Sequence, residues 1–148
     1  MPQTLTALVV TRDRLDHLQT TLAALLDSAP KALSCVVVLD NASSDGTSVW
    51  LAAQTDPRLI VLTQSRNLGG AGGFEAGLAH IRDHLDPDWI VMMDDDARPE
   101  IGALEQFHSI DRSTHDAWVT AVRYPSGGIC DMSRPWINPF WSMGGFLK

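Results

Sequence analysis

The sequence is poor in cysteine, in positive charge and in long apolar runs, and each shortage excludes a class of protein. Two cysteines among 148 residues, Cys35 and Cys130, build no disulfide framework, so we expect free thiols in a reducing compartment, with Cys35 buried. With 11 Lys and Arg against 18 Asp and Glu, the net charge is −7, which argues against a nucleic-acid partner. No apolar stretch approaches the length of a membrane span. We therefore expect a cytoplasmic protein, with peripheral association at the inner face of the membrane left open.

Apolar runs typical of strands alternate with helical spacings of apolar residues along most of the chain. The run "CVVVLD" is continuously apolar before its aspartate, as in a strand that is buried on both faces. Strands are expected at residues 5–10, 35–40, 58–63, 89–93 and 116–124, and helices at residues 15–29, 47–53, 74–85 and 99–109, with a glycine-rich loop at 64–73. This alternation indicates βαβ units, and so an α/β fold with a mostly parallel, Rossmann-like sheet and helices on both faces.

The character of the chain changes near residue 124. We expect one α/β domain over residues 1–124 and an irregular, aromatic segment over residues 125–148, rich in Gly, Pro and Trp. Because such an aromatic segment should pack against something, we expect it to lead toward residues that follow Lys148.

Polar side chains follow each of the first four expected strands. Ligands of parallel α/β sheets bind beyond the carboxyl ends of the strands, so these groups are candidates for one shared crevice. The candidates are Thr11 and Arg14 after the first strand, Asp40 and Asn41 after the second, Arg66 and Asn67 after the third, and Asp94, Asp95 and Asp96 after the fourth.

The three adjacent aspartates suggest a cation. Alternate side chains of an extended segment share a face, so Asp94 and Asp96 should point one way and Asp95 the other. Two carboxylates on one side suit a hard divalent cation, Mg²⁺ or Mn²⁺. The alternative is a solvated acidic turn that caps the helix following Pro99.

The segment "NLGGAGGF" at residues 67–74 holds four glycines ahead of a helix. Glycine lets a backbone approach a ligand closely, and a helix N-terminus favours anions. Neither the dinucleotide fingerprint nor the phosphate loop of nucleotide hydrolases fits this spacing. The alternative is a turn in which glycine permits close packing of helix on sheet.

Other polar residues fit ordinary structural roles. Asp45 in "SSDGT" is expected to form a turn or cap a helix. His80 and His84 have a metal-ligand spacing, but no third ligand is near them in the sequence, so an exposed helix surface is expected.

Taken together, "VVTRDR", "VVLDNASSDGT", "NLGGAGGF" and "WIVMMDDDARP" resemble the family 2 glycosyltransferases, over about residues 5 to 110. The resemblance is to the donor-binding half of the GT-A fold, and to the galactofuranosyltransferase and rhamnosyltransferase branch. Arg12 and Asp13 depart from it, because the family commonly has an aromatic residue and asparagine there.

The resemblance implies a role for each candidate. Asp40 would accept the imide proton of uracil or thymine, Arg14 would help to hold the base or the phosphates, and Asp95 would lie near the ribose or donor sugar. The implied nucleotide-sugar contacts are Thr11, Arg14, Asp40, Arg66, Asn67, Gly70, Asp94 and Asp95, and the implied metal ligands, in a DXD motif, are Asp94 and Asp96. The catalytic base of the family belongs to the acceptor-binding half and is expected beyond Lys148.

The expected function is that of a metal-dependent, inverting glycosyltransferase with Mn²⁺ or Mg²⁺ as cofactor. It would take a UDP- or dTDP-sugar and pass the sugar to a glycan or lipid-linked acceptor in cell-wall or polysaccharide biosynthesis, with these 148 residues alone inactive in transfer. Two alternatives remain, a truncated nucleotide-sugar-binding module without catalysis and a sugar nucleotidyltransferase. The latter needs a glycine-rich loop after the first strand, where "TRDRLD" has no glycine. No oligomeric state is indicated.

Overall fold

The fold is taken from a computed structural model, which describes residues 3–113 and 115–130. The chain divides into two compact units, Met1–Ile110 and Asp111–Lys148. All the helices and strands assigned in the described ranges belong to the first unit. No helix in those ranges is long and apolar enough to cross a membrane.

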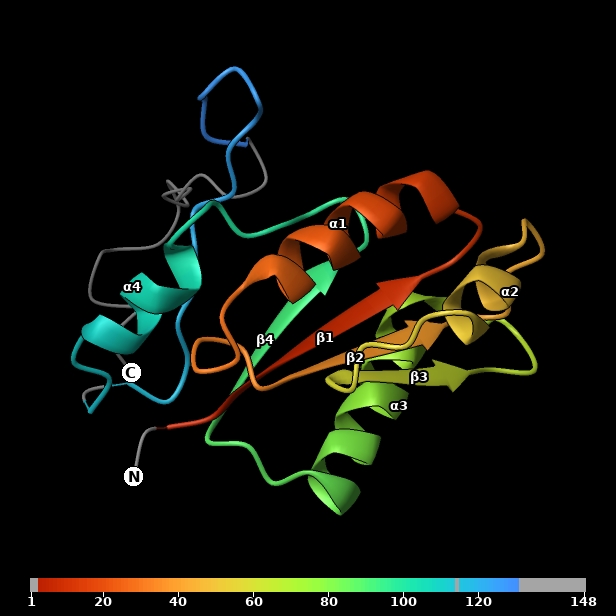
Figure 1. Cartoon of the computed structure of the whole chain (residues 1–148), viewed down its shortest axis with the longest axis horizontal. Helices are drawn as coiled ribbons and strands as arrows, with labels where there is room; N and C mark the ends of the chain where they lie inside the picture. The colour runs from red at the N-terminus through yellow and green to blue at the C-terminus, as the bar shows by residue number, and fades with distance from the viewer. Residues whose placement is uncertain (1–2, 114, 131–148) are drawn as a thin grey trace, which may run out of the picture. The chain divides into compact units, whose positions relative to one another are not determined.

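Four parallel strands form the sheet of the first unit (Figure 1): β1 (Leu5–Thr11), β2 (Cys35–Asp40), β3 (Leu59–Thr63) and β4 (Trp89–Asp94). Their order is β3-β2-β1-β4, so the chain first builds outward on one side of β1 and then crosses to the other. Thr11 pairs in register with Asp40, and Val10 with Asp94. The carboxyl ends of β1, β2 and β4 therefore lie at the same edge of the sheet. The chain adds strands on one side of β1 and then on the other, so this edge includes the point at which the strand order changes direction.

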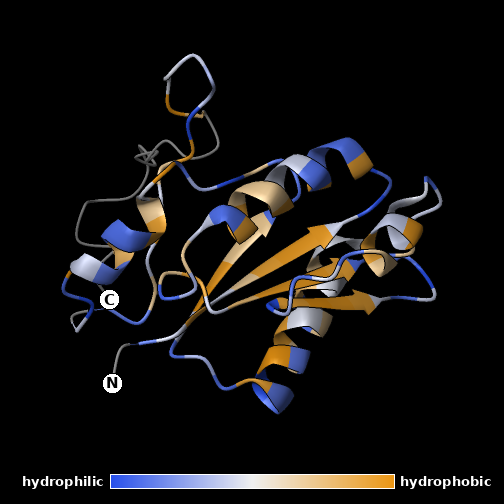
Figure 2. Ribbon diagram, viewed as in Figure 1, coloured by the Kyte–Doolittle hydropathy of each residue, from blue (hydrophilic) through white to orange (hydrophobic). Residues whose placement is uncertain are grey.

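Helices cover both faces of the sheet, as the sequence predicts. Figure 1 shows α1 (Leu15–Asp27), α2 (Thr47–Ala52) and α4 (Ala103–Ser109) on one face and α3 (Gly69–His84) on the other. Figure 2 shows the strands as the most hydrophobic part of the unit. Every residue of β1 is buried, because this central strand is covered on both faces.

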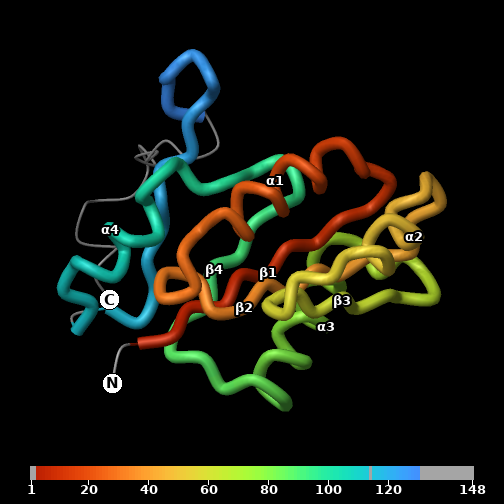
Figure 3. Tube along the Cα trace, viewed as in Figure 1, coloured from red at the N-terminus to blue at the C-terminus, as the bar shows by residue number. Residues whose placement is uncertain are grey.

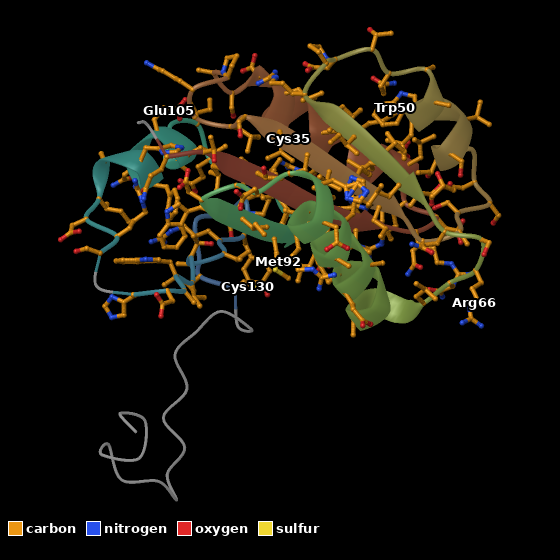
Figure 4. All side chains as sticks on the ribbon, turned by 90° about the horizontal axis from the view of Figure 1, so that it is seen from below. Cys35, Trp50, Arg66, Met92, Glu105 and Cys130 are labelled. Carbon is orange, nitrogen blue, oxygen red and sulfur yellow. The ribbon has the colours of Figure 1, made fainter. Side chains whose placement is uncertain are left out.

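The core is divided by the sheet into two clusters. The larger cluster, on the face of α1, holds Leu5, Ala7, Val9, Leu18, Leu22, Leu25, Ala32, Leu33, Val36, Val38, Leu51 and Leu104. The smaller one, on the face of α3, is centred on Leu8, Val37 and Ile81. On that second face β4 is left partly uncovered, with Met92 48% exposed (Figure 4).

Helix α3 begins at Gly69, so the prediction that residues 64–73 form a loop is wrong for the glycines 69, 70, 72 and 73. Tertiary packing overrides their weak helix propensity. A Cβ atom on Gly73 would lie 2.7 Å from Val10 Cγ1, and one on Gly77 would lie 2.5 Å from Leu8 Cδ1. These two glycines therefore let α3 lie close against β1.

Two further predictions near the end of the described chain are wrong. Residues 116–124 form no strand: an isolated antiparallel bridge joins Arg123 and Ile129, and Val119 is 96% exposed. A strand needs a ladder of hydrogen bonds to a neighbouring strand, and within the described residues this segment has only that isolated bridge. The helix expected from residue 99 begins at Ala103, because Gly102 has a φ of 82°, outside the helical region.

In the second unit the described residues form a turn around Gly127, whose φ is 87°. The Tyr124 N–H donates to the Gly128 carbonyl at 2.8 Å, and the Cys130 N–H to the Val122 carbonyl at 2.7 Å. Residues 131–148, most of the aromatic segment predicted over 125–148, lie outside the described residues.

Cys35 is a free thiol, as expected, but it is half-buried instead of fully buried. It is the first residue of β2 (Figure 4), so it lies at the rim of the sheet and not in its middle. The partial burial raises the pKa of the Cys35 thiol.

Candidate functional site

The candidate site is the edge of the sheet where the parallel strands end. Figure 3 follows the chain out of β1, β2 and β4 into loops at this edge. The polar residues of these loops are joined by hydrogen bonds between segments far apart in the sequence. The site is therefore preorganised by the fold.

The middle aspartate of the triplet is an anchored structural group. Asp95 is 3% exposed, and the Thr11 hydroxyl donates to its Oδ2 at 2.8 Å. The Thr21 hydroxyl of α1 donates to its backbone carbonyl at 2.7 Å. Arg14 Nη1 donates to its Oδ1 at 3.1 Å. The energetic cost of burying this carboxylate is thus offset by the neutral Thr11 hydroxyl on one oxygen and the Arg14 cation on the other.

The outer aspartates of the triplet are both exposed while Asp95 is buried, which agrees with the predicted alternation of their side chains. Arg14 Nη1 donates to Asp96 Oδ2 at 2.8 Å, so one guanidinium nitrogen bridges Asp95 and Asp96. Hydrogen bonds to these two carboxylates raise the pKa of Arg14. The carboxylate of Asp94 makes no hydrogen bond with the described residues. The positive charge that three adjacent aspartates require is therefore supplied in part by the chain itself.

The two outer carboxylates fit a hard divalent cation, but only as part of a coordination sphere. Within the described ranges, no group of three or more His, Cys, Asp or Glu side chains is arranged to hold a metal ion. Mg²⁺ and Mn²⁺ commonly take one or two carboxylates and complete their coordination with water and phosphate oxygens. Asp94 and Asp96 are therefore suited to a cation that arrives with a phosphorylated ligand.

Asp40, expected to face a base, is completely buried beneath the turn that follows β2. Its Oδ1 accepts the Ser43 N–H at 2.9 Å, and its Oδ2 accepts a hydrogen bond from the Ser48 hydroxyl. The carboxylate thus ties together the turn that follows its own strand.

Asn41, a candidate at the end of the second strand to which the sequence assigned no specific role, fixes the start of α3. Its Oδ1 accepts the Leu68 N–H at 2.8 Å, and its Nδ2 donates to Asn67 Oδ1 at 2.9 Å and to the Gly69 carbonyl at 3.0 Å. Asn67 Oδ1 also accepts the Gly69 N–H at 2.8 Å. The sequence indicates such a role, because a side-chain amide directly after a buried strand needs hydrogen-bond partners for both its oxygen and its NH₂ group.

The loops after β1 and β2 are fastened to each other by two aspartates. Asp13 has a φ of 51°, and its Oδ1 accepts the Ser44 N–H at 2.6 Å. Asp45 accepts the Leu15 N–H at 3.1 Å and the Thr47 N–H at 3.0 Å, so it caps both α1 and α2. The capping role predicted for Asp45 is confirmed.

These contacts stabilise the ionised forms of both aspartates. The backbone hydrogen bond from Ser44 lowers the pKa of Asp13. The hydroxyl of Thr47 lowers the pKa of Asp45. Both carboxylates are therefore charged at neutral pH, and they add to the negative potential around Arg14.

Arg66 and Gly70 lie at the outer end of this edge, apart from the hydrogen-bonded network. Arg66 projects outward from the loop between β3 and α3 (Figure 4) and makes no hydrogen bond or ion pair with the described residues. Gly70 has open space within 4 Å of where a Cβ atom would lie. Both are accessible to a ligand.

Two hollows open on the surface of the first unit. One, of about 470 Å³, is lined by Asp13, Arg14, Leu15, Asp16, His17 and Asp45 and adjoins the aspartate triplet through Arg14. The other, of about 830 Å³, is a groove between α3 and β4 lined mainly by apolar side chains, including Phe74, Leu78 and Ile90. Only the first lies at the strand ends, so we place the site there in spite of its smaller volume.

The fold thus brings Thr11, Arg14, Asp95 and Asp96 into one network, and Asn67 into a second network with Asn41. Asp40 lies below the surface between them, and Arg66 and Gly70 lie at the rim. His84 is exposed on α3 as expected, whereas His80 is half-buried, and their ring centroids lie 4.5 Å apart.

Comparisons with known proteins agree on one family. The model of the family described as glycosyl transferase family 2 matches residues 6–147. The galactofuranosyltransferase GlfT1 of Mycolicibacterium smegmatis is 39% identical over 93 residues, which cover 63% of this chain and 30% of the relative. The succinoglycan biosynthesis protein ExoO of Rhizobium meliloti is 37% identical over 67 residues, 44% of this chain and 18% of the relative. The chain thus spans less than a third of the length of either relative.

Solved structures show the same fold at lower identity. A mannosyltransferase of Pyrobaculum calidifontis, in complex with GDP-Man and Mn²⁺, has a TM-score of 0.65 at 24% identity, covering 85% of this chain and 37% of that one. TarS of S. aureus, in complex with UDP-GlcNAc, has a TM-score of 0.60 at 19% identity, covering 72% and 30%. The α/β architecture described above therefore matches the fold of these two solved structures.

Proposed function

Because this chain belongs to glycosyl transferase family 2, we propose that its sheet edge binds the nucleoside diphosphate part of a UDP- or dTDP-sugar for a metal-dependent glycosyl transfer. The galactofuranosyltransferase relative supports a galactofuranosyl donor, and the succinoglycan biosynthesis relative supports a role in polysaccharide biosynthesis. The acceptor would be a glycan or a lipid-linked sugar. The chain covers only 30% of the galactofuranosyltransferase relative. The transfer reaction itself, like the donor and the acceptor, is therefore part of what we propose.

The observation that carries the proposal is the arrangement of the aspartate triplet. Asp95 is buried and anchored by Thr11, while Asp94 and Asp96 are exposed on either side of it at the ends of the strands. A solvated helix cap would not require a buried, hydrogen-bonded carboxylate in its middle. No side chain of the triplet caps α4, which begins at Ala103 after Gly102.

Asp94 and Asp96 would hold Mn²⁺ or Mg²⁺. Such a cation, when bound, supplies charge neutralisation to a departing diphosphate. The role of the chain's own residues is to bind and orient the donor. Arg14 would contact the diphosphate, and the exposed Arg66 and Gly70 would contact the nucleoside or phosphates from the opposite rim.

Base recognition would fall to Asp40. A carboxylate accepts the imide N–H of uracil or thymine and rejects cytosine, which lacks that proton. In the structure both oxygens of Asp40 already accept hydrogen bonds, from Ser43 and Ser48, beneath the turn at residues 42–46. Recognition through Asp40 therefore requires this turn to move aside and one of these donors to be replaced by the base.

The experiment is a calorimetric titration of the 148-residue chain with UDP, dTDP, CDP, ADP and GDP, each with and without Mn²⁺. UDP and dTDP should bind more tightly than the other three, and only with the metal ion present. The variant Asp94→Asn should lower UDP affinity about tenfold, because one anionic metal ligand is lost. Asp27→Asn is the matched control, because Asp27 is exposed at the far end of α1.

Each failure has a distinct meaning. Equal affinity for all five nucleotides would remove the role of Asp40 and leave the metal site in place. Binding that is the same with and without Mn²⁺, or is unchanged in Asp94→Asn, would remove the metal site. Absence of nucleotide binding altogether would overturn the proposal.

A further inference from the structure

We propose that Arg14 is a resident counter-ion of the aspartate triplet, which a divalent cation displaces from Asp96 and which then turns to the diphosphate of the donor. The turn of Arg14 to the diphosphate rests on the proposed function, whereas the displacement of Arg14 from Asp96 concerns the metal ion alone. It makes Arg14 the residue that couples metal binding to nucleotide binding.

The contacts of Arg14 are those of a counter-ion shared between two carboxylates. A single nitrogen, Nη1, lies 3.1 Å from Asp95 Oδ1 and 2.8 Å from Asp96 Oδ2. No other Lys or Arg of the described residues is ion-paired with the triplet. One of the two oxygens of Asp96, Oδ2, is therefore occupied by the guanidinium.

The two carboxylates differ in how firmly they are held. The side chain of Asp95 is 4% exposed and that of Asp96 is 47% exposed. Thr11 holds the side chain of Asp95 and Thr21 holds its backbone, whereas Asp96 has only Arg14. Breaking the half-exposed contact costs little, while the buried one keeps Arg14 at the site.

A divalent cation and the guanidinium compete for the negative charge of the same carboxylate. Mg²⁺ and Mn²⁺ bind carboxylate oxygens directly, and a cation seated between Asp94 and Asp96 would repel a guanidinium at hydrogen-bond distance. Once freed from Asp96, the guanidinium of Arg14 has donors available, and a diphosphate offers the acceptors that match its planar fork.

The consequence is positive coupling between the two ligands. Metal ion alone must displace Arg14 without giving it a new partner, so it binds weakly. With a diphosphate present the displaced guanidinium gains contacts, and by linkage each ligand raises the affinity of the other by the same factor.

The test compares Arg14→Gln with Arg12→Gln, two variants with the same change in net charge. Arg12 is exposed and pairs only with Asp13, at 3.3 Å, so it controls for the general loss of positive charge. Mn²⁺ binding without nucleotide is followed by the electron paramagnetic resonance of free Mn²⁺, and UDP binding at saturating Mn²⁺ by calorimetry.

Arg14→Gln should bind Mn²⁺ alone about twofold to fivefold more tightly than Arg12→Gln, the range expected for removing a half-exposed ion pair. It should bind UDP about tenfold more weakly, because the diphosphate loses a charge-assisted donor. The two affinities thus move in opposite directions in one variant. Mn²⁺ affinity in Arg14→Gln equal to or below that of Arg12→Gln overturns the displacement of Arg14.

A measurement on the unaltered chain covers the case in which Arg14→Gln does not fold. During a Mg²⁺ titration the side-chain ¹⁵N resonance of Arg14 should shift with metal occupancy while that of Arg12 stays fixed. A stationary Arg14 resonance overturns the inference. If the chain binds no UDP at all, the proposed function fails, and the two metal-only measurements still decide whether Arg14 is displaced.

Discussion

The Thr11 hydroxyl donates a 2.8 Å hydrogen bond to the buried carboxylate of Asp95, and this bond joins the end of β1 to the residue that follows β4. The contact separates the triplet into one structural aspartate and two exposed ones. It also positions the carboxylate of Asp95, which shares the guanidinium of Arg14 with the carboxylate of Asp96.

Replacing Asp95 should therefore reduce stability. Asp95→Ala leaves the buried Thr11 hydroxyl without its acceptor and Arg14 without its buried partner, so we expect a loss of about 2 kcal/mol in the free energy of unfolding. Urea unfolding measures it. Asp94→Ala is the control, because its exposed carboxylate makes no hydrogen bond with the described residues, and it should change stability by less than about 0.5 kcal/mol. Equal losses in the two variants would show that the distinction between these aspartates is wrong.

Two glycines of α3, Gly73 and Gly70, should differ in how much stability is lost when each is replaced by alanine. A Cβ atom on Gly73 would meet Val10 Cγ1 at 2.7 Å, and Val10 is a stiff, β-branched side chain in the central strand. Gly73→Ala should destabilise the chain by about 1–3 kcal/mol through overpacking. Gly70→Ala meets nothing within 4 Å and should be neutral or stabilising by up to about 1 kcal/mol. Thermal unfolding of both variants checks the prediction, and a stable Gly73→Ala would contradict the close approach of α3 to β1.

The two helix caps made by Asp45 should depend on pH. Hydrogen bonds, first that from the Thr47 hydroxyl, hold the folded-state pKa of Asp45 below its ordinary value of 3.8. The carboxylate therefore contributes stability at neutral pH, and that contribution is lost as the pH falls below 3.8 toward the folded-state pKa.

Asp45→Ala should accordingly be less stable than the unaltered chain by about 1 kcal/mol at pH 7, with the difference shrinking below pH 4. Chemical unfolding at a series of pH values measures this. Asp27→Ala serves as control: it removes an exposed charge at the carboxyl end of α1 and should be neutral or slightly stabilising. A difference for Asp45→Ala that persists unchanged at pH 3 would argue against the caps.

Features that depend on local pattern could be predicted from the sequence. The run of β2 indicated a strand covered on both faces, and the period of a strand predicted that Asp94 and Asp96 share one side and Asp95 points the other way. The capping role of Asp45 followed from turn chemistry alone. These outcomes rest on backbone geometry, which nearby residues determine.

Features that depend on distant partners could not be predicted. The pairing of Arg14 with Asp96 joins loops that only the sheet brings together. The helical state of Gly69–Gly73 depends on packing against β1, and the burial of Asp40 depends on the turn that folds over it. Residues 116–124 have the composition of a strand, yet the described chain offers them no neighbouring strand.

The central claim is that the strand-end edge, and not the larger groove between α3 and β4, binds a nucleoside diphosphate with a divalent cation. The most direct measurement is a titration of the ¹⁵N-labelled chain with UDP and Mg²⁺, followed by amide chemical shifts. The account predicts that the largest shifts occur at Thr11–Arg14, Asp40–Ser44, Arg66–Gly70 and Asp94–Asp96. Shifts concentrated at Phe74, Leu78 and Ile90, or no shifts at saturating ligand, would contradict it.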